Sequence, residues 1–232
     1  MKKILSFLIV VILAGGLWWV MRPSGFDTGA PLVSQGDAID LLQDLDTDKL
    51  SEGWVHRTFF TASAADYQMT EEDGAVALRC ATDNSASILA RDTEISLDAL
   101  PFLHWDWKVT TPIESDVDET SKEGDDHPVR LFLVFSNDSD DRNAMEIIWS
   151  NKKYAPGDYK IIGDFHHYVA NGLNENIGKW HSQTVDLRQI YSDIGGTGTP
   201  TLQVLGFFCD SDNTGAQSEG FFRDVRLSDT DG

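Results

Sequence analysis

Alternation of apolar and polar residues is the feature that most limits what this chain can fold into. Over residues 102–109, every second side chain is large and apolar, and most of the side chains between them are polar. A period of two puts successive side chains on opposite faces of a β-strand, so one face of this segment is expected to be core. Residues 129–136 repeat the pattern. The predicted core face of the two segments contains Leu103, Trp105, Trp107, Val109, Val129, Leu131, Leu133 and Phe135.

Further short segments with strand-like composition follow, and turn pairs such as Asp73-Gly74 and Pro156-Gly157 separate them. Many short strands with few helices predict an all-β domain, a jelly-roll-type β-sandwich over residues 37–232. Residues 37–50 are an exception, because apolar residues recur there at helical spacing behind an aspartate, and we expect one short amphipathic helix. The further strands are expected at residues 54–60, 67–70, 75–80, 87–91, 145–150, 159–162, 180–186, 202–209 and 220–227.

The first 22 residues have the pattern of a membrane-targeting segment. Two lysines precede an apolar run over residues 4–21, and Trp18 and Trp19 lie near its outer end. As a helix the run spans about 27 Å, close to the thickness of a hydrocarbon core, and the lysines keep its start in the cytoplasm. We expect residues 1–22 to be a single-pass anchor in a bacterial inner membrane, residues 23–36 a tether, and the domain to be periplasmic. The alternative is a cleaved signal that leaves a soluble periplasmic or secreted protein.

The charge balance excludes one class of partner. The chain has 38 acidic and 18 basic residues, a formal net charge of −20. Affinity for nucleic acid comes mainly from lysine and arginine neutralising phosphates, so this surface has the wrong sign. We expect no nucleic acid partner, and we attribute the acidity mainly to solubility.

Two cysteines, Cys80 and Cys209, both end predicted strands. In an oxidising compartment they could pair across the sandwich. The alternative is two separate buried thiols that act as small hydrophobic residues. Spacing alone leaves both open.

A charged residue in a core-forming strand is the strongest pointer to a binding face. Arg130 alternates with core residues, so it must lie on the opposite, partly enclosed face and needs an acidic partner, for which Asp106 and Glu146 are the candidates. A sheet carrying these groups would present a polar groove suited to sugar hydroxyls or carboxylates. We therefore expect Arg130→Lys to weaken ligand binding and leave the fold largely intact. The alternative is a structural ion-pair network on a solvent-facing sheet. The predicted ligand-binding residues are His104, Asp106, Lys108, Arg130 and Glu146.

Evidence for catalysis is thin. Asp106 and Glu146 could serve glycoside hydrolysis if a cleft separated them by the right distance. His166 and His167 are neighbours on a strand and point to opposite faces, and no zinc-type spacing is present. There is no nucleophile elbow and no phosphate-binding glycine loop. We therefore name no catalytic residue and expect the chain not to be an enzyme.

The turn over residues 210–215 invites a calcium interpretation. Asp210 and Asp212 offer oxygen ligands, and Gly215 falls at the sixth place of an EF-hand-like count, but the twelfth place is Phe221 where a glutamate is required. We prefer a structural turn in which side chains accept hydrogen bonds from backbone amides. No cofactor is expected, with calcium at Asp210 and Asp212 as the one alternative.

Three local patterns together resemble a bacterial family catalogued as domain of unknown function 3047. They are Leu103-x-Trp105-x-Trp107-Lys108, the run over residues 124–132, and Asp-Ser-Asp-Asn-Thr-Gly over residues 210–215. The likeness extends from about Trp54 to Leu227. It implies a leader or anchor and one sandwich domain, and it implies no activity.

The sequence therefore predicts an envelope-tethered β-sandwich binding module, with a saccharide or another glycan as the favoured ligand. The rivals are an enzyme acting on an envelope polysaccharide and a scaffold that docks another envelope protein. Seven tryptophans suggest sugar stacking. However, Trp105, Trp107 and Trp149 fall on apolar faces, where core packing is the better interpretation.

Overall fold

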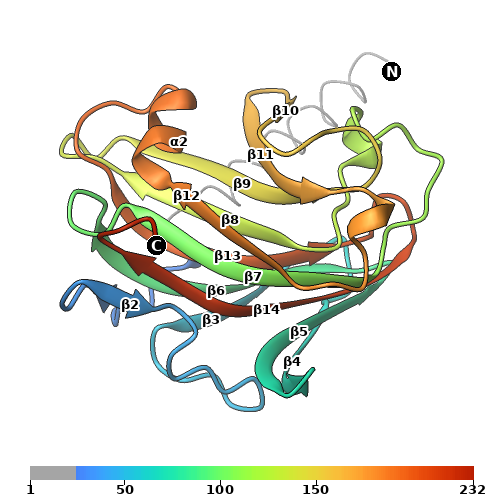
Figure 1. Cartoon of the computed structure of the whole chain (residues 1–232), viewed down its shortest axis with the longest axis horizontal. Helices are drawn as coiled ribbons and strands as arrows, with labels where there is room; N and C mark the ends of the chain where they lie inside the picture. The colour runs from blue at the N-terminus through green and yellow to red at the C-terminus, as the bar shows by residue number, and fades with distance from the viewer. Residues whose placement is uncertain (1–24) are drawn as a thin grey trace, which may run out of the picture.

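Two β-sheets packed face to face form the domain (Figure 1), and our computed structural model describes residues 25–232. The larger sheet has eight strands. In order across the sheet they are β1 (Leu32–Val33), β6 (Ala86–Ser96), β13 (Thr201–Asp210), β8 (Arg130–Ser136), β9 (Arg142–Ser150), β11 (Phe165–Gly172) and β10 (Tyr159–Ile162), and β3 (Trp54–Thr58) also pairs with β6.

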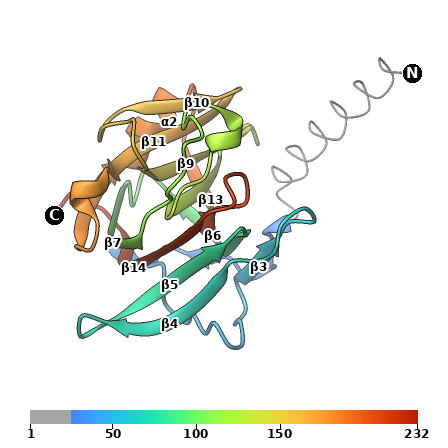
Figure 2. The same ribbon diagram turned by 90° about the vertical axis from the view of Figure 1, so that its right-hand side faces the viewer.

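The smaller sheet has six strands. Their order is β12 (His181–Asp186), β7 (Phe102–Thr111), β14 (Gln217–Ser228), β5 (Ala75–Asp83) and β4 (Asp66–Glu72), and β2 (Ala38–Asp40) also pairs with β14. In Figure 2, β10 and β11 lie at one end of the molecule and the hairpin of β4 and β5 lies at the other. This two-sheet sandwich confirms the all-β prediction, whereas the jelly-roll subtype stays a prediction.

The main core fills the space between the sheets, as the alternation predicts. Trp105 and Trp107 on β7 are 1% and 0% exposed, and Trp149 on β9 is 1% exposed. The centre of the Trp107 ring lies 5.3 Å from that of Trp105 and 5.8 Å from that of Trp149, both in edge-to-face contacts. The contact between Trp107 and Trp149 joins the two sheets. These tryptophans therefore serve packing and are not available to stack on sugars.

A second apolar cluster lies on the outer face of the larger sheet. It contains Phe26, Ile88, Ala90, Phe132, Val134 and Val204. Phe132 and Val134 alternate along β8 with the core residues Leu131 and Leu133, so this sheet is apolar on both faces near its centre.

The N-terminal segment of the described chain covers that second cluster, which differs from the predicted tether at residues 23–36. Phe26 is 1% exposed and packs on Phe132 with 5.6 Å between ring centres. Thr28 donates from its backbone N and its Oγ1 to Asp92 at 2.8 and 2.7 Å, and β1 pairs in parallel with β6. Burial of one aromatic ring and a short strand pairing hold this segment on the sheet, although its glycines and proline suggested a linker.

The predicted helix at residues 37–50 is wrong. The segment forms β2 and a series of turns, and Leu41 is fully buried. The Asp40 carboxylate accepts a hydrogen bond from Leu42 N at 2.8 Å, and that of Asp46 accepts from Asp48 N and Lys49 N at 3.0 and 3.1 Å. Aspartate side chains that bond to nearby backbone amides compete with a helix, and here they favour turns despite the helical spacing of apolar residues.

One helix that the sequence analysis missed closes an end of the sandwich. This helix, α2 (Leu187–Asp193), begins at Asp186, whose side chain accepts a hydrogen bond from Arg188 N. Tyr191 packs on Phe135 with 5.5 Å between ring centres. Within residues 25–232, no helix is both long and apolar enough to cross a membrane, and the predicted anchor at residues 1–22 lies outside the described residues.

Cys80 on β5 and Cys209 on β13 are joined in a disulfide, with 6.4 Å between their Cα atoms. Both residues are fully buried in the main core. The bridge links one strand of each sheet across 129 residues of sequence. A covalent link that closes so long a loop restricts the unfolded chain strongly.

We predict that the paired variant Cys80→Ala with Cys209→Ala loses about 2 to 5 kcal/mol of unfolding free energy, because the loop constraint disappears. Urea unfolding followed by tryptophan fluorescence measures this loss. Treating the wild type with reductant should reproduce it, and the double variant should not respond to reductant. Two free thiols per chain in the unfolded, unreduced wild type would contradict the bridge.

Candidate functional site

A buried ion network lies on the outer face of the larger sheet, around Arg130. This residue opens β8 and is 2% exposed. It is paired with Ile148 on β9 and Phe208 on β13. Because side chains alternate along strands, the residues two places from these partners, Glu146 and Asp210, fall on the same face as the guanidinium. Strand register thus places an acid on each side of Arg130.

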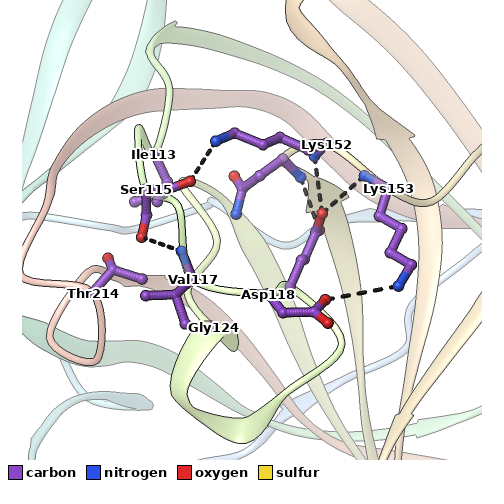
Figure 3. Close-up of a pocket in the computed structure, with 10 residues that line it drawn as sticks. Ile113, Ser115, Val117, Asp118, Gly124, Lys152, Lys153 and Thr214 are labelled. Carbon is purple, nitrogen blue, oxygen red and sulfur yellow. Dashed lines mark hydrogen bonds and ion pairs between the residues drawn. The ribbon is translucent and has the colours of Figure 1, made fainter.

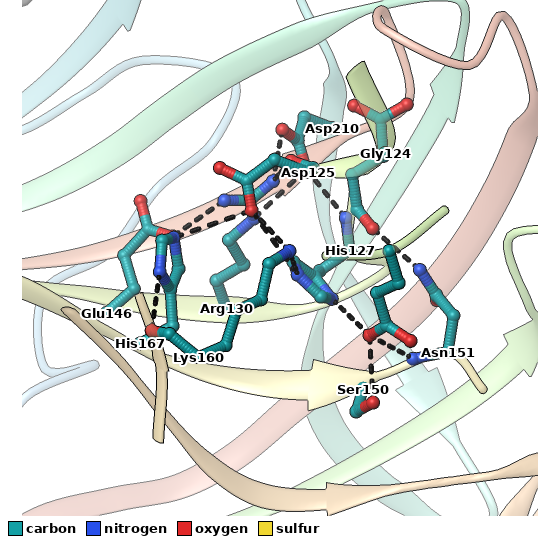
Figure 4. A network of polar contacts seen from close by, with 12 residues as sticks. Gly124, Asp125, His127, Arg130, Glu146, Ser150, Asn151, Lys160, His167 and Asp210 are labelled. Carbon is teal, nitrogen blue, oxygen red and sulfur yellow. Dashed lines mark hydrogen bonds and ion pairs between the residues drawn. The ribbon is translucent and has the colours of Figure 1, made fainter. Parts of the chain in front are cut away.

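Four hydrogen bonds hold the guanidinium (Figure 4). Its Nε donates to Asp210 Oδ1 at 3.1 Å, and its Nη1 donates to Glu146 Oε2 at 2.6 Å. Its Nη2 donates to Asp210 Oδ2 and to the backbone oxygen of Asp125. The guanidinium carbon also lies 4.7 Å from the centre of the Phe208 ring. Nη1 has a second N–H, for which the described residues show no hydrogen bond.

Two strands that follow in the sequence add basic groups to the network. Lys160 on β10 donates to Asp125 Oδ1 at 2.6 Å and to His127 Nε2 at 3.0 Å. His167 on β11 is paired with Lys160 across the hairpin. Its Nε2 lies 3.5 Å from Asp125 Oδ1 and 3.4 Å from Glu146 Oε2. Asp125 therefore stands between Arg130, Lys160 and His167 and links three parts of the chain.

Burial and neighbouring charges shift the pKa values of four groups in this network. Burial alone would raise the pKa of Asp125 and Glu146, but the Arg130 guanidinium outweighs it and holds both values below their usual range. Burial would lower the pKa of His167, but Asp125 and Glu146 raise it to about 9. Burial, with Lys160 beside it, lowers the pKa of His127 to about 4. At neutral pH, His167 is therefore charged and His127 is neutral.

The network opens into a small pocket of about 190 Å³ on the outer face of the larger sheet. Four phenylalanine residues line it, and three of them are half-buried. Polar groups lie against this apolar wall, a combination typical of small-molecule sites. The lining residues are Phe59, Ile88, Asp125, Arg130, Phe132, Glu146, Phe165, His167, Phe208, Asp210 and Asn213.

The structure brings together only two of the five predicted ligand-binding residues, Arg130 and Glu146. The other three lie on β7 of the smaller sheet and have partners there. Asp106 accepts from Arg223 at 3.0 Å, and Lys108 donates to Glu72 and Asp73 at 2.6 and 2.8 Å. His104 contacts the hydroxyls of Thr184 and Ser228 at 2.9 and 2.7 Å.

The predicted polar groove of His104, Asp106 and Lys108 with Arg130 and Glu146 is therefore wrong. Alternation with core residues identifies an outward-facing position, but each of the two sheets has its own outer face. The same separation removes Asp106 and Glu146 as a hydrolytic pair, because they belong to different sheets. The expectation that Arg130→Lys leaves the fold intact is also revised, since most of its donors bond to buried protein groups.

The turn over residues 210–215 is held by a neighbouring aspartate. The carboxylate of Asp126, which is fully buried, accepts hydrogen bonds from the backbone and side chain of both Asn213 and Thr214 at 2.6 to 3.3 Å. Asp210 accepts from His127 N at 2.9 Å in addition to Arg130. Asp126, Asp210 and Asp212 have carboxylate oxygens within 4.8 Å of one another. Two of these three carboxylates already serve the fold, which supports a structural turn.

A second hollow, of about 170 Å³, lies beside the loop at residues 113–124 (Figure 3). Glu119 organises it by accepting hydrogen bonds from Ser150 Oγ and from three successive backbone amides, at residues 151–153. Lys152 donates to the backbone oxygen of Ser115, and Lys153 lies 3.7 Å from Asp118. These contacts hold the loop in place, so we assign this hollow a structural role.

One family model covers most of this domain. Residues 52–226 match the family model "Protein of unknown function (DUF3047)". The chain belongs to the DUF3047 family. The matched range includes all the residues of the ion network and both cysteines. No curated protein matches the chain.

Several solved structures resemble this DUF3047 domain distantly. The family 30 carbohydrate-binding module of a Clostridium thermocellum cellulosomal cellulase is 11% identical, with a TM-score of 0.40, and the match covers 78% of this chain and 93% of that one. Another family 30 carbohydrate-binding module is 10% identical, with a TM-score of 0.40, over 75% and 98% of the two chains. The enzymatically active domain of bacteriophage CBA120 tailspike protein 4 is 8% identical, with a TM-score of 0.39, over 75% of this chain and 19% of that one. Values this low do not transfer a ligand.

We predict that Arg130→Lys destabilises the domain by about 1 to 3 kcal/mol, because lysine keeps the positive charge but cannot donate to all the buried acceptors, and at least one of them loses its hydrogen bond. Urea unfolding measures the change. The matched control is Arg188→Lys, whose partner Asp186 lies 3.3 Å away on the surface, and its effect should stay below about 1 kcal/mol. Equal unfolding free energies for the two variants would show that the buried contacts of Arg130 contribute no more to stability than an exposed ion pair.

We predict a specific pH dependence from His167. Its pKa of about 9 exceeds the ordinary 6.5, so charged His167 stabilises the fold fully below about pH 6.5 and loses this contribution as the pH rises through 9. The change is of order 3 kcal/mol. Unfolding free energies measured from pH 6 to 10 should fall more steeply for the wild type than for His167→Gln. Parallel curves for the two proteins would rule out a charged His167.

Proposed function

We propose that this DUF3047 protein is a saccharide-binding module of the bacterial envelope, and that the pocket at Arg130 is its binding site. The observation that carries the proposal is the composition of that pocket, in which four phenylalanine rings stand beside ionised carboxylates. Residues 1–22 supply the predicted inner-membrane anchor, and the domain is the predicted periplasmic part. The jelly-roll subtype belongs to the same proposal.

A sugar suits this pocket because a pyranose ring has two kinds of surface. Its C–H groups pack on aromatic rings, and its hydroxyls donate to carboxylate oxygens and accept from N–H groups. Phe165 and Phe208 supply ring faces at the rim, while Asp125, Glu146 and the remaining N–H of Arg130 supply polar contacts. A volume of about 190 Å³ fits one sugar residue and leaves the rest of a chain outside.

Charge favours a neutral or weakly charged glycan over a polyanion. The formal net charge of the chain is −20, which repels nucleic acids and strongly sulfated or phosphorylated polymers. The basic groups of the network do not offset this, because Arg130, Lys160 and His167 each contact carboxylates of the protein.

We predict that the full chain in detergent binds at least one neutral oligosaccharide on a glycan array, and that Phe165→Ala reduces its affinity about tenfold or more. Loss of the ring removes roughly 1.5 to 3 kcal/mol of apolar contact, and each 1.4 kcal/mol is a factor of ten. Isothermal titration calorimetry with the best array ligand measures the affinity. Phe165→Tyr should retain it.

The matched control is Trp180→Ala, which removes a half-buried ring beside the smaller sheet, where the guanidinium carbon of Arg223 lies 3.9 Å from the centre of the Trp180 ring. Its affinity should equal that of the wild type. Binding that depends on Trp180 and not on Phe165 would move the site to the other face. No binding to any glycan would remove the proposed function, and turnover of the bound oligosaccharide would place the protein among the enzymes.

A further inference from the structure

The described chain enters the domain beside the pocket. Phe26 packs 5.6 Å from Phe132, and Phe132 lines the pocket. Ile88, another pocket residue, belongs to the same apolar cluster as Phe26. The first described residues therefore lie within one side chain of the binding site and on the same sheet face.

Buried and hydrogen-bonded contacts hold the first described residues on the sheet. The Arg57 guanidinium lies 4.7 Å from the centre of the Phe26 ring, and a Cβ added to Gly25 would lie 2.1 Å from Arg57 Nη1. Phe26 is 1% exposed. Two residues after it, the backbone N of Thr28 donates a hydrogen bond to the Asp92 carboxylate. A side chain at Gly25 would have to displace the end of the Arg57 side chain. Residues 25–28 are thus held on the sheet face, and no loose loop separates Gly25 from the pocket.

Little chain separates this entry point from the apolar run. The run ends at Met21 in the sequence, and Arg22, Pro23 and Ser24 stand between it and Gly25. Four peptide steps span at most about 14 Å, even when fully extended. If residues 1–22 anchor the protein as proposed, the outer face of the larger sheet is held near the headgroups, and the smaller sheet faces away from the membrane.

We propose that the pocket faces the membrane surface and that its ligand is the sugar of a glycan carried on a membrane lipid. This inference rests on the proposed saccharide binding and on the proposed anchor. With only Arg22, Pro23 and Ser24 between the apolar run and Gly25, the effective concentration of a membrane-borne sugar at the pocket is high. Phe60, fully exposed in the turn after the pocket residue Phe59, adds an apolar contact suited to the lipid interface.

Photo-crosslinking of the full chain tests the orientation. The photoreactive amino acid p-benzoylphenylalanine replaces Phe60 in one sample and Val76, which is exposed on the smaller sheet, in the other. Both proteins are reconstituted in vesicles of phosphatidylethanolamine and phosphatidylglycerol and irradiated. We expect lipid labelling at position 60 to exceed that at position 76 several-fold. A long glycine-serine insertion after Arg22 should remove the difference, and equal labelling without the insertion would overturn the proposal.

A second experiment identifies the ligand class. The same photoreactive residue replaces Phe59 in the pocket wall, and the full chain is reconstituted in vesicles made from the total lipid extract of a bacterial envelope. Mass spectrometry of the adduct should find a lipid that bears a sugar, and Phe165→Ala should abolish this adduct. Adducts with sugar-free phospholipids alone, or no adduct, would contradict a lipid-borne glycan.

The two proposals fail in different ways. A protein that binds array glycans and labels lipids equally from positions 60 and 76 retains the proposed function and loses the membrane-facing pocket. A protein that labels lipids mainly from position 60 and binds no glycan loses both the proposed function and the lipid-borne ligand, while the orientation stands.

Discussion

The buried guanidinium of Arg130 is the interaction on which the outer face of the larger sheet depends. A charge removed from water is stable only when its donors are matched, and here the acceptors come from β13, β9 and the loop before β8. Any shift in register by one residue would turn Glu146 or Asp210 to the other side of the sheet. The network therefore favours one register of strand pairing, and its residues also line the pocket. Lys160 and His167 fix the position of the edge hairpin of β10 and β11 in the same way, through their contacts with Asp125 and Glu146.

The two outer faces of the sandwich use charge differently. On the smaller sheet, pairs such as Arg79 with Asp66 or Lys108 with Asp73 each involve a well exposed partner. Pairs of that kind contribute little and are easily exchanged. On the larger sheet, Arg130, Lys160 and His167 are almost inaccessible and share the carboxylates of Asp125 and Glu146. Substitution of a charged residue should therefore lower the stability of the domain most on the outer face of the larger sheet.

The sequence was sufficient to predict the layers of the fold but only part of the site. Alternation correctly assigned Leu103, Trp105 and Trp107 to the core, since a strand with one apolar face has a single stable orientation. It also gave Glu146 as one of two candidate partners of Arg130, and the structure shows that ion pair. It failed for Asp106, because periodicity defines a face within a strand and carries no information about which sheet the strand joins.

Other residues were missed for a related reason. Lys160 and His167 come close to Arg130 only because β11 runs parallel beside β9, a long-range pairing that no local pattern reveals. The sequence marks His167 as one of two adjacent histidines on a strand but does not indicate which residues surround it. Similarly, the spacing of leucines in residues 37–50 matched a helix, while the turns formed by Asp40 and Asp46 decided otherwise.

The disulfide has a consequence for the order in which this protein becomes competent. Cys209 directly precedes Asp210, so the bridge to Cys80 ends one residue from a principal partner of Arg130. Before oxidation, the end of β13 is held by non-covalent contacts alone. A chain that acquires its bridge only outside the reducing cytoplasm would complete its pocket there too. Formation of one sulfur–sulfur bond would then fix the strand end that forms one side of the pocket.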